Sequence, residues 1–139
     1  RKKVFNLLNE SIKLRGIADV EVGVFLSGGI DSSTNAYLFS KSSKKKIKTF
    51  SIGYDKNYKS YKSELDYARI VAEETGSDHH EKVLNKNDLI KTLREMIYHQ
   101  DEPISDPVCF PILYLSDLAK SKKDCGKFVL FVILKIISY

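Results

Sequence analysis

The stretch VGVFLSGGIDSS, residues 22–33, constrains the fold of this chain more than any other segment. It opens with a run of mostly apolar residues, which is typical of a strand that is covered on both faces. The run ends in a loop of small and polar residues, after which a helix can begin at Asp31. Gly28 and Gly29 allow a positive φ and a close approach of the backbone to a ligand, which a Cβ atom would prevent. Because the free N–H groups at the start of a helix suit an anion, the stretch predicts a phosphate-binding loop between a strand and a helix.

The loop carries further groups that suit a nucleotide. Ser27, Ser32 and Ser33 supply hydroxyl donors, and Asp31 supplies an oxygen ligand for a magnesium ion. No Lys follows the glycines where a Walker A loop needs one, and the third glycine of a dinucleotide fingerprint is absent. Two interpretations follow: a phosphate loop of another kind, or a tight turn in which the two glycines serve geometry alone.

The rest of the chain alternates between patterns of strands and patterns of helices. Expected strands lie at residues 22–26, 48–54 and 78–84, and expected helices at 4–15, 31–40, 63–76, 87–97 and 111–120. Ser63 and Asn87 are the predicted N-caps of two of these helices, and Gly76 is a predicted helix stop. The alternation predicts a three-layer α/β/α fold with a parallel, doubly wound (Rossmann-like) sheet of about four to five strands. Ligands of such sheets bind beyond the carboxyl ends of the strands, where the loop lies.

Composition restricts the class of protein. The 139 residues suffice for one domain, and 23 basic against 18 acidic side chains give a net charge of +5. Much of the excess lies in residues 41–48, KSSKKKIK, which we interpret as a solvated loop and not as a nucleic-acid surface. Cys109 and Cys125 form no CxxC pair, which favours a reducing, cytoplasmic location. The apolar stretch 128–137 is too short to span a bilayer and contains Lys135, so no membrane association is expected.

Two other clusters could carry chemistry. His79 and His80 are neighbours in an expected strand, where adjacent side chains point to opposite faces, so they are interpreted as structural and not as ligands of one metal. Asp101, Glu102 and Asp106 lie in a proline-punctuated loop. These carboxylates could meet Mg²⁺ or a substrate, or could serve solvation and helix capping, and both interpretations stay open.

The loop resembles a known phosphate-binding motif. LSGGIDSS is similar to the SGGxDS pyrophosphate loop of the N-type ATP pyrophosphatases, the PP-loop or adenine nucleotide alpha hydrolase-like superfamily. Four later segments resemble, in order and spacing, the synthetase domain of glutamine-hydrolysing asparagine synthetases: TFSIGY (49–54), SELDYAR (63–69), GSDHHE (76–81) and DEPISDP (101–107). The resemblance covers nearly all of residues 1 to about 130.

The resemblance implies a reaction and a set of site residues. Its substrates are ATP, aspartate and ammonia from glutamine, with Mg²⁺ as cofactor. The β-carboxylate of aspartate is adenylated with release of pyrophosphate, and ammonia then displaces AMP. Leu26 and Ile52 correspond to positions that line adenine and ribose, with core packing as the alternative. The positions that correspond to the phosphate site are Ser27, Gly28, Gly29, Asp31 and Ser32, with Asp31 on Mg²⁺. No catalytic residue is assigned.

The sequence also departs from that family. It has no amidohydrolase (glutaminase) domain, which is expected in the parent chain, and it lacks the second phosphate loop, SGEGxDE. CGKFVL at 125–130 leads instead into FVILKIISY, an apolar tail that predicts aggregation or the formation of a homodimer. Residues 1–139 are therefore interpreted as a partial ATP-pyrophosphatase domain, truncated or divergent after about residue 130 and inactive by itself. The alternatives are a non-catalytic nucleotide-binding or vestigial module, or another PP-loop adenylating enzyme of the tRNA-thiolating, NAD-forming or GMP-forming type.

Overall fold

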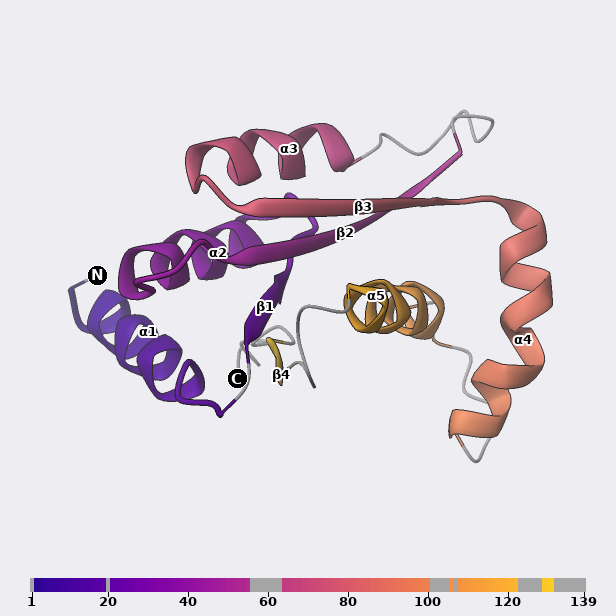
Figure 1. Cartoon of the computed structure of the whole chain (residues 1–139), viewed down its shortest axis with the longest axis horizontal. Coiled ribbons are helices and arrows are strands. Elements are labelled where there is room, and N and C mark those ends of the chain that lie inside the picture. Colours follow the sequence, from indigo (N-terminus) through magenta and orange to yellow (C-terminus); the bar gives the residue numbers. More distant parts are fainter. Residues whose placement is uncertain are drawn as a thin grey trace.

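The computed structural model of the chain describes residues 2–19, 21–55, 64–100, 106, 108–122 and 129–131. Helices and strands alternate along most of this part of the chain (Figure 1). In chain order the elements are α1 (Lys2–Arg15), β1 (Val22–Phe25), α2 (Ile30–Ser42), β2 (Lys48–Tyr54), α3 (Leu65–Glu74), β3 (Asp78–Leu84), α4 (Lys86–Gln100), α5 (Cys109–Ser121) and β4 (Val129–Phe131).

The strands form one parallel sheet in the order β3-β2-β1-β4. Val24 of β1 lies beside Thr49 of β2, and Thr49 lies beside His79 of β3, so the carboxyl ends of these strands share one edge. The chain proceeds from β1 outward to β2 and β3 and then returns to the other side of β1 for β4. A topological switch point therefore lies at the carboxyl end of β1, which is where ligands bind in open α/β sheets.

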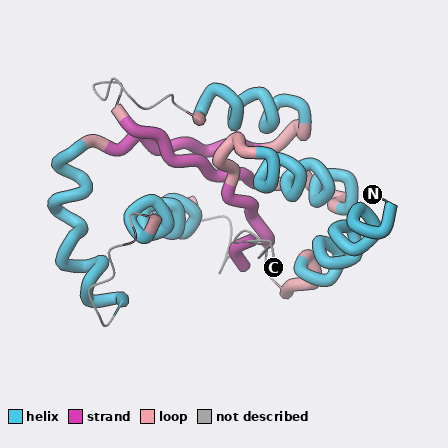
Figure 2. The backbone as a smooth tube through the Cα atoms, turned by 180° about the vertical axis from the view of Figure 1, so that it is seen from behind, coloured by secondary structure: helices cyan, strands magenta, loops and turns pink. Residues whose placement is uncertain are grey.

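Helices cover both faces of the sheet (Figures 1 and 2). On one face, Val22 and Val24 of β1 pack with Ile12 of α1 and with buried residues of α2 and α3. On the other face, Phe25 and Phe50 pack with Ala119 of α5. The alternation of β1 side chains between two hydrophobic clusters is what a strand covered on both sides requires. The predicted three-layer, parallel α/β fold is thereby confirmed.

Most predicted elements are present, with shifts at the helix starts. The strands at 48–54 and 78–84 have the predicted bounds. The predicted cap of α4, Asn87, is wrong, because the side chain of Asn85 accepts hydrogen bonds from the backbone N–H groups of Asn87 (2.8 Å) and Asp88 (3.2 Å). In return, the Asp88 carboxylate accepts the Asn85 N–H, which makes a reciprocal cap and starts the helix earlier.

Helix α5 likewise begins before the predicted residue 111. The Asp106 carboxylate accepts the Val108 N–H at 2.9 Å, so this carboxylate caps the helix, one of the two interpretations left open above. Gly76 ends α3 with a φ of +60°, as predicted. The predicted cap Ser63, the acidic residues at 101 and 102, and the tail after residue 131 lie outside the described residues. Within the described part of the chain, no helix is both long and apolar enough to cross a membrane.

Candidate functional site

The predicted loop lies at the carboxyl end of β1, at the switch point of the sheet. Leu26 extends the pairing of β1 with β2, because its N–H donates to the Phe50 carbonyl at 2.9 Å. The Ser51 hydroxyl also donates to the Leu26 carbonyl, so two hydrogen bonds join Leu26 to β2 where the loop begins. The loop then reaches Gly29, the N-cap of α2. The structure thus has the predicted strand–loop–helix unit.

Two serine hydroxyls hold the loop closed. The Ser32 hydroxyl donates to the Gly29 carbonyl at 3.1 Å and accepts the Ser27 N–H at 3.2 Å. The two hydroxyl oxygens of Ser27 and Ser32 lie 2.9 Å apart, and since the Ser32 O–H is directed at Gly29, the Ser27 O–H donates to Ser32. Ser27 Oγ in turn accepts the Gly29 N–H at 3.3 Å. Both hydroxyls shape the loop in this structure, while Ser32 itself is buried.

The two glycines have different roles. Gly28 has the predicted positive φ, +82°. The same expectation for Gly29 is wrong, since its φ is −71° and any residue can adopt that backbone. A Cβ atom at Gly28 would lie 2.7 Å from the Glu64 carbonyl oxygen and 2.9 Å from the Ala68 nitrogen, whereas at Gly29 the nearest contact would be Ser27 Oγ at 3.4 Å. Gly28 is therefore required by its packing against α3, whether or not a ligand is bound. Gly29 leaves open space in front of the helix.

The start of α2 presents backbone donors to that space. No side chain among the described residues caps this helix, and its first turn carries an exposed carboxylate, Asp31. Ser33 N–H makes the first helical hydrogen bond, to Gly29. An uncapped N-terminus with free N–H groups carries partial positive charge and can bind an anion.

The residues predicted to contact adenine and ribose differ in exposure. Leu26 is 1% exposed and belongs to the core cluster with Val24 and Ala68, so its side chain packs in the core. Ile52 is half-buried on β2, near the same edge of the sheet as the loop. The structure thus brings Ile52 and the loop to one edge, with the Leu26 backbone between them.

The histidines have structural partners, as the sequence predicted. His79 Nδ1 lies 2.8 Å from Thr49 Oγ1, and its Nε2 lies 3.1 Å from Glu81 Oε1. Burial lowers the pKa of His79, and the neighbouring Glu81 carboxylate partly opposes that shift. His80 points to the other face, where its ring stacks on Phe50 with centroids 5.4 Å apart. In the described ranges no three His, Cys, Asp or Glu side chains gather as metal ligands would.

Sequence reasoning missed the ion pair that holds α3 on the sheet. Arg69 donates from Nε to one oxygen of Glu81 at 2.9 Å and from a terminal nitrogen to the other at 2.7 Å. The hydrogen bond from Arg69 lowers the pKa of Glu81. Arg69 and Glu81 end two of the segments that resemble the family, SELDYAR and GSDHHE, but their spacing in the sequence does not show that the two side chains meet.

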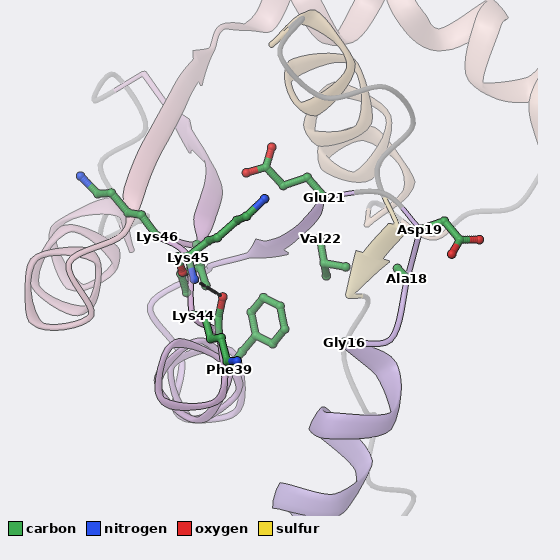
Figure 3. Close-up of a pocket in the computed structure, with 11 residues that line it drawn as sticks. Gly16, Ala18, Asp19, Glu21, Val22, Phe39, Lys44, Lys45 and Lys46 are labelled. Atoms are coloured by element: carbon green, nitrogen blue, oxygen red, sulfur yellow. Dashed lines mark hydrogen bonds between the residues drawn. The ribbon is translucent and has the colours of Figure 1, made fainter.

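A cavity of about 460 Å³ lies at the opposite edge of the sheet, before the amino ends of β1 and β2 (Figure 3). One wall is the lysine run, with Lys44, Lys45 and Lys46 exposed to solvent, and Phe39 and Glu21 also line the cavity. Lys45 extends toward Glu21 in this view. The cavity is separate from the predicted phosphate loop, because the sheet lies between them.

The comparisons with known proteins agree with this geometry. The model of the asparagine synthase family matches residues 3–130. The chain is 33% identical over 119 residues, 86% of its length, to asparagine synthetase [glutamine-hydrolyzing] 1 of Bacillus subtilis. It is 34% identical over 115 residues, 82% of its length, to a putative asparagine synthetase of Methanocaldococcus jannaschii. These matches cover only 18% and 22% of the two relatives, so the chain corresponds to about a fifth of their length.

Among solved structures, the fold is similar to that of an NH3-dependent NAD synthetase from Campylobacter jejuni, with a TM-score of 0.54. The identity is 17%, and the match covers 87% of this chain and 52% of that one, so the likeness concerns the fold alone. The described part of the chain is thus a parallel α/β domain with a glycine-containing loop at its switch point. The chain belongs to the asparagine synthase family, because the family model spans most of its residues.

Proposed function

We propose that this chain is the ATP-binding part of an asparagine synthetase. The observation that carries the proposal is the uncapped start of α2 behind Gly29 at the switch point of the sheet. The backbone N–H groups there would face the ATP phosphates across the space that Gly29 leaves open. Membership of the asparagine synthase family supports ATP as the nucleotide.

Each predicted site residue has a role in this proposal. Ser27, Gly28 and Ser32 hold the loop in shape, and Gly29 lets the phosphates approach. The Leu26 backbone and the half-buried Ile52 would border the adenosine moiety. Asp31, exposed on the first turn of α2, would be a protein carboxylate on Mg²⁺, with phosphate oxygens and water as further ligands. A bound Mg²⁺ would neutralise charge on the phosphates as pyrophosphate leaves.

The proposed reaction is that of the family: adenylation of the β-carboxylate of aspartate, followed by amidation with ammonia derived from glutamine. We assign residues 1–139 to a partial ATP-pyrophosphatase domain whose glutaminase domain lies elsewhere in the parent chain. The length of the relatives, which this chain covers only to about a fifth, supports that assignment. A cytoplasmic location belongs to the same proposal, supported by the free thiol of Cys109.

The 139 residues alone should not release pyrophosphate from ATP in the presence of aspartate. Asp31 supplies one carboxylate, and the sequence holds no SGEGxDE loop to supply a second. Loss of a single stabilising group commonly costs on the order of 10²–10³ in rate, and here several are missing. A coupled pyrophosphate assay tests this: turnover that depends on aspartate and disappears in Asp31→Asn would show that the chain is competent. The non-catalytic nucleotide-binding module is the second candidate, and the same assay on the parent chain separates the two.

Binding is tested by calorimetry with Mg-ATP. Gly29→Asp places a negative charge in the open space in front of α2 without a clash, and we expect it to abolish binding while the fold is retained. Asn6→Asp adds the same charge on exposed α1 and is the control, with wild-type affinity expected. Equal affinity of Gly29→Asp and the wild type for Mg-ATP would show that the loop does not bind the nucleotide.

A further inference from the structure

The first turn of α3 packs directly against the back of the loop. At Gly28, the space for a Cβ atom is taken by the Glu64 carbonyl oxygen at 2.7 Å, the Tyr67 Cβ at 2.8 Å and the Ala68 nitrogen at 2.9 Å. Two of these atoms are backbone, which cannot turn aside as the end of a side chain can. The backbone of the loop and the backbone of α3 therefore touch, and neither can move toward the other.

The same turn of α3 also rests on β2. A Cβ atom at Gly53 would overlap Leu65 Cδ1 and lie 2.8 Å from Leu65 Cγ. Leu65 is 5% exposed, so packing restricts where its side chain can go. Leu65 occupies the place that a side chain at position 53 would take. Gly53 comes directly after Ile52, at the edge of the sheet where the loop lies.

The middle of α3 is fastened to the sheet at a third point. The two-bonded ion pair between Arg69 and Glu81 joins the helix to β3. Glu81 also contacts His79, and His79 contacts Thr49 of β2.

We propose that the first turn of α3 positions the phosphate loop, and that Gly53 and Leu65 are positioning residues for nucleotide binding. The inference rests on the proposed function, because it concerns the same loop. A side chain at position 53 displaces Leu65 and the turn that carries it, and the support behind Gly28 moves with that turn. The loop then spends less time in the shape that binds phosphate. If the competent fraction falls to about a tenth, the apparent Kd rises about tenfold.

The test compares substitutions at two glycines that flank α3. Gly53→Ala should raise the Kd for Mg-ATP about tenfold by calorimetry and speed amide hydrogen exchange of residues 27–33 in the free protein. Gly76→Ala is the control: it strains the other end of α3 at a φ of +60°, but its Cβ meets nothing within 4 Å. This control should lower the melting temperature and leave both the Kd and the exchange of the loop unchanged.

A second substitution separates positioning from general loss of stability. Leu65→Ala removes the atoms that a Cβ at position 53 would meet, so adding it to Gly53→Ala should slow the exchange of the loop again. If Gly53→Ala does not fold, Leu65→Ala alone removes the same contact from the helix side and should loosen the loop. Wild-type affinity and loop exchange in Gly53→Ala would overturn the inference. If the wild type does not bind Mg-ATP, the proposed function fails, while the exchange measurements still decide whether α3 positions the loop.

Discussion

Ser32→Ala removes the hydroxyl that makes most of the hydrogen bonds within the loop. That hydroxyl makes contacts of 3.2 Å with the Ser27 N–H, 2.9 Å with Ser27 Oγ and 3.1 Å with the Gly29 carbonyl. Each intramolecular hydrogen bond contributes a net stabilisation of about 0.5–1.5 kcal/mol. Because Gly29 is exposed, water can replace part of the loss. We therefore expect the free energy of unfolding to fall by about 1.5–3 kcal/mol.

Urea denaturation followed by circular dichroism measures this loss. The free energy of unfolding of a small domain falls by about 1–3 kcal/mol per molar of urea, so the urea concentration at the midpoint of unfolding should fall by roughly 1 M. Ser116→Ala is the matched control, since the Ser116 hydroxyl donates only to the Ile112 carbonyl, in an exposed hydrogen bond, and its midpoint should change little. A midpoint for Ser32→Ala that equals that of Ser116→Ala would refute the view that the two serines hold the loop.

Three further predictions follow from other contacts. Burial lowers the pKa of His79 below its ordinary value of 6.5, so its contribution to stability should be complete above about that pH and be lost as the pH falls toward the folded pKa. Urea midpoints at several pH values test this, and a His79→Gln variant with the same pH dependence would contradict it. Asn85→Ala should cost about 1 kcal/mol by loss of the helix cap. Asn87→Ala should cost less than about 0.5 kcal/mol, and thermal unfolding that ranks the two the other way would contradict the cap assignment. Asp31→Asn should raise the Kd for Mg-ATP roughly tenfold, equivalent to about 1.4 kcal/mol, and leave that for ATP in EDTA unchanged by calorimetry. An equal effect on the Kd with and without Mg²⁺ would show that Asp31 does not bind the metal.

The sequence allowed the strands and the place of the loop to be predicted, because these depend on local pattern. The run KTFSIGY is rich in β-branched and aromatic residues, and β2 spans the same residues. The motif SGGIDSS follows an apolar strand, and a parallel sheet brings such a loop to the carboxyl edge. Local pattern was a weaker guide to helix starts, where Asn85 and Asn87 are both good caps and only the return bond from Asp88 decides between them.

Contacts between distant segments could not be predicted. The sequence suggested that Gly28 is needed for a ligand, but the atoms around its missing Cβ belong to α3. Likewise, Gly53 resembles any glycine in a strand until Leu65 is found against it. The pairing of Arg69 with Glu81 depends on how α3 lies on β3, which no spacing in the sequence specifies. These are tertiary effects, and they determine the shape of the candidate site.

The most direct test of the account is a titration of the ¹⁵N-labelled chain with Mg-ATP, followed by NMR. ATP is an anion, so two regions of this structure could attract it: the loop at the carboxyl edge and the exposed lysines at the amino edge. If ATP binds at the loop, the shifts should be saturable and largest for the amides of residues 28–33 and for Ile52. Shifts that are largest for Lys44, Lys45 and Lys46, with residues 28–33 unchanged, would contradict it.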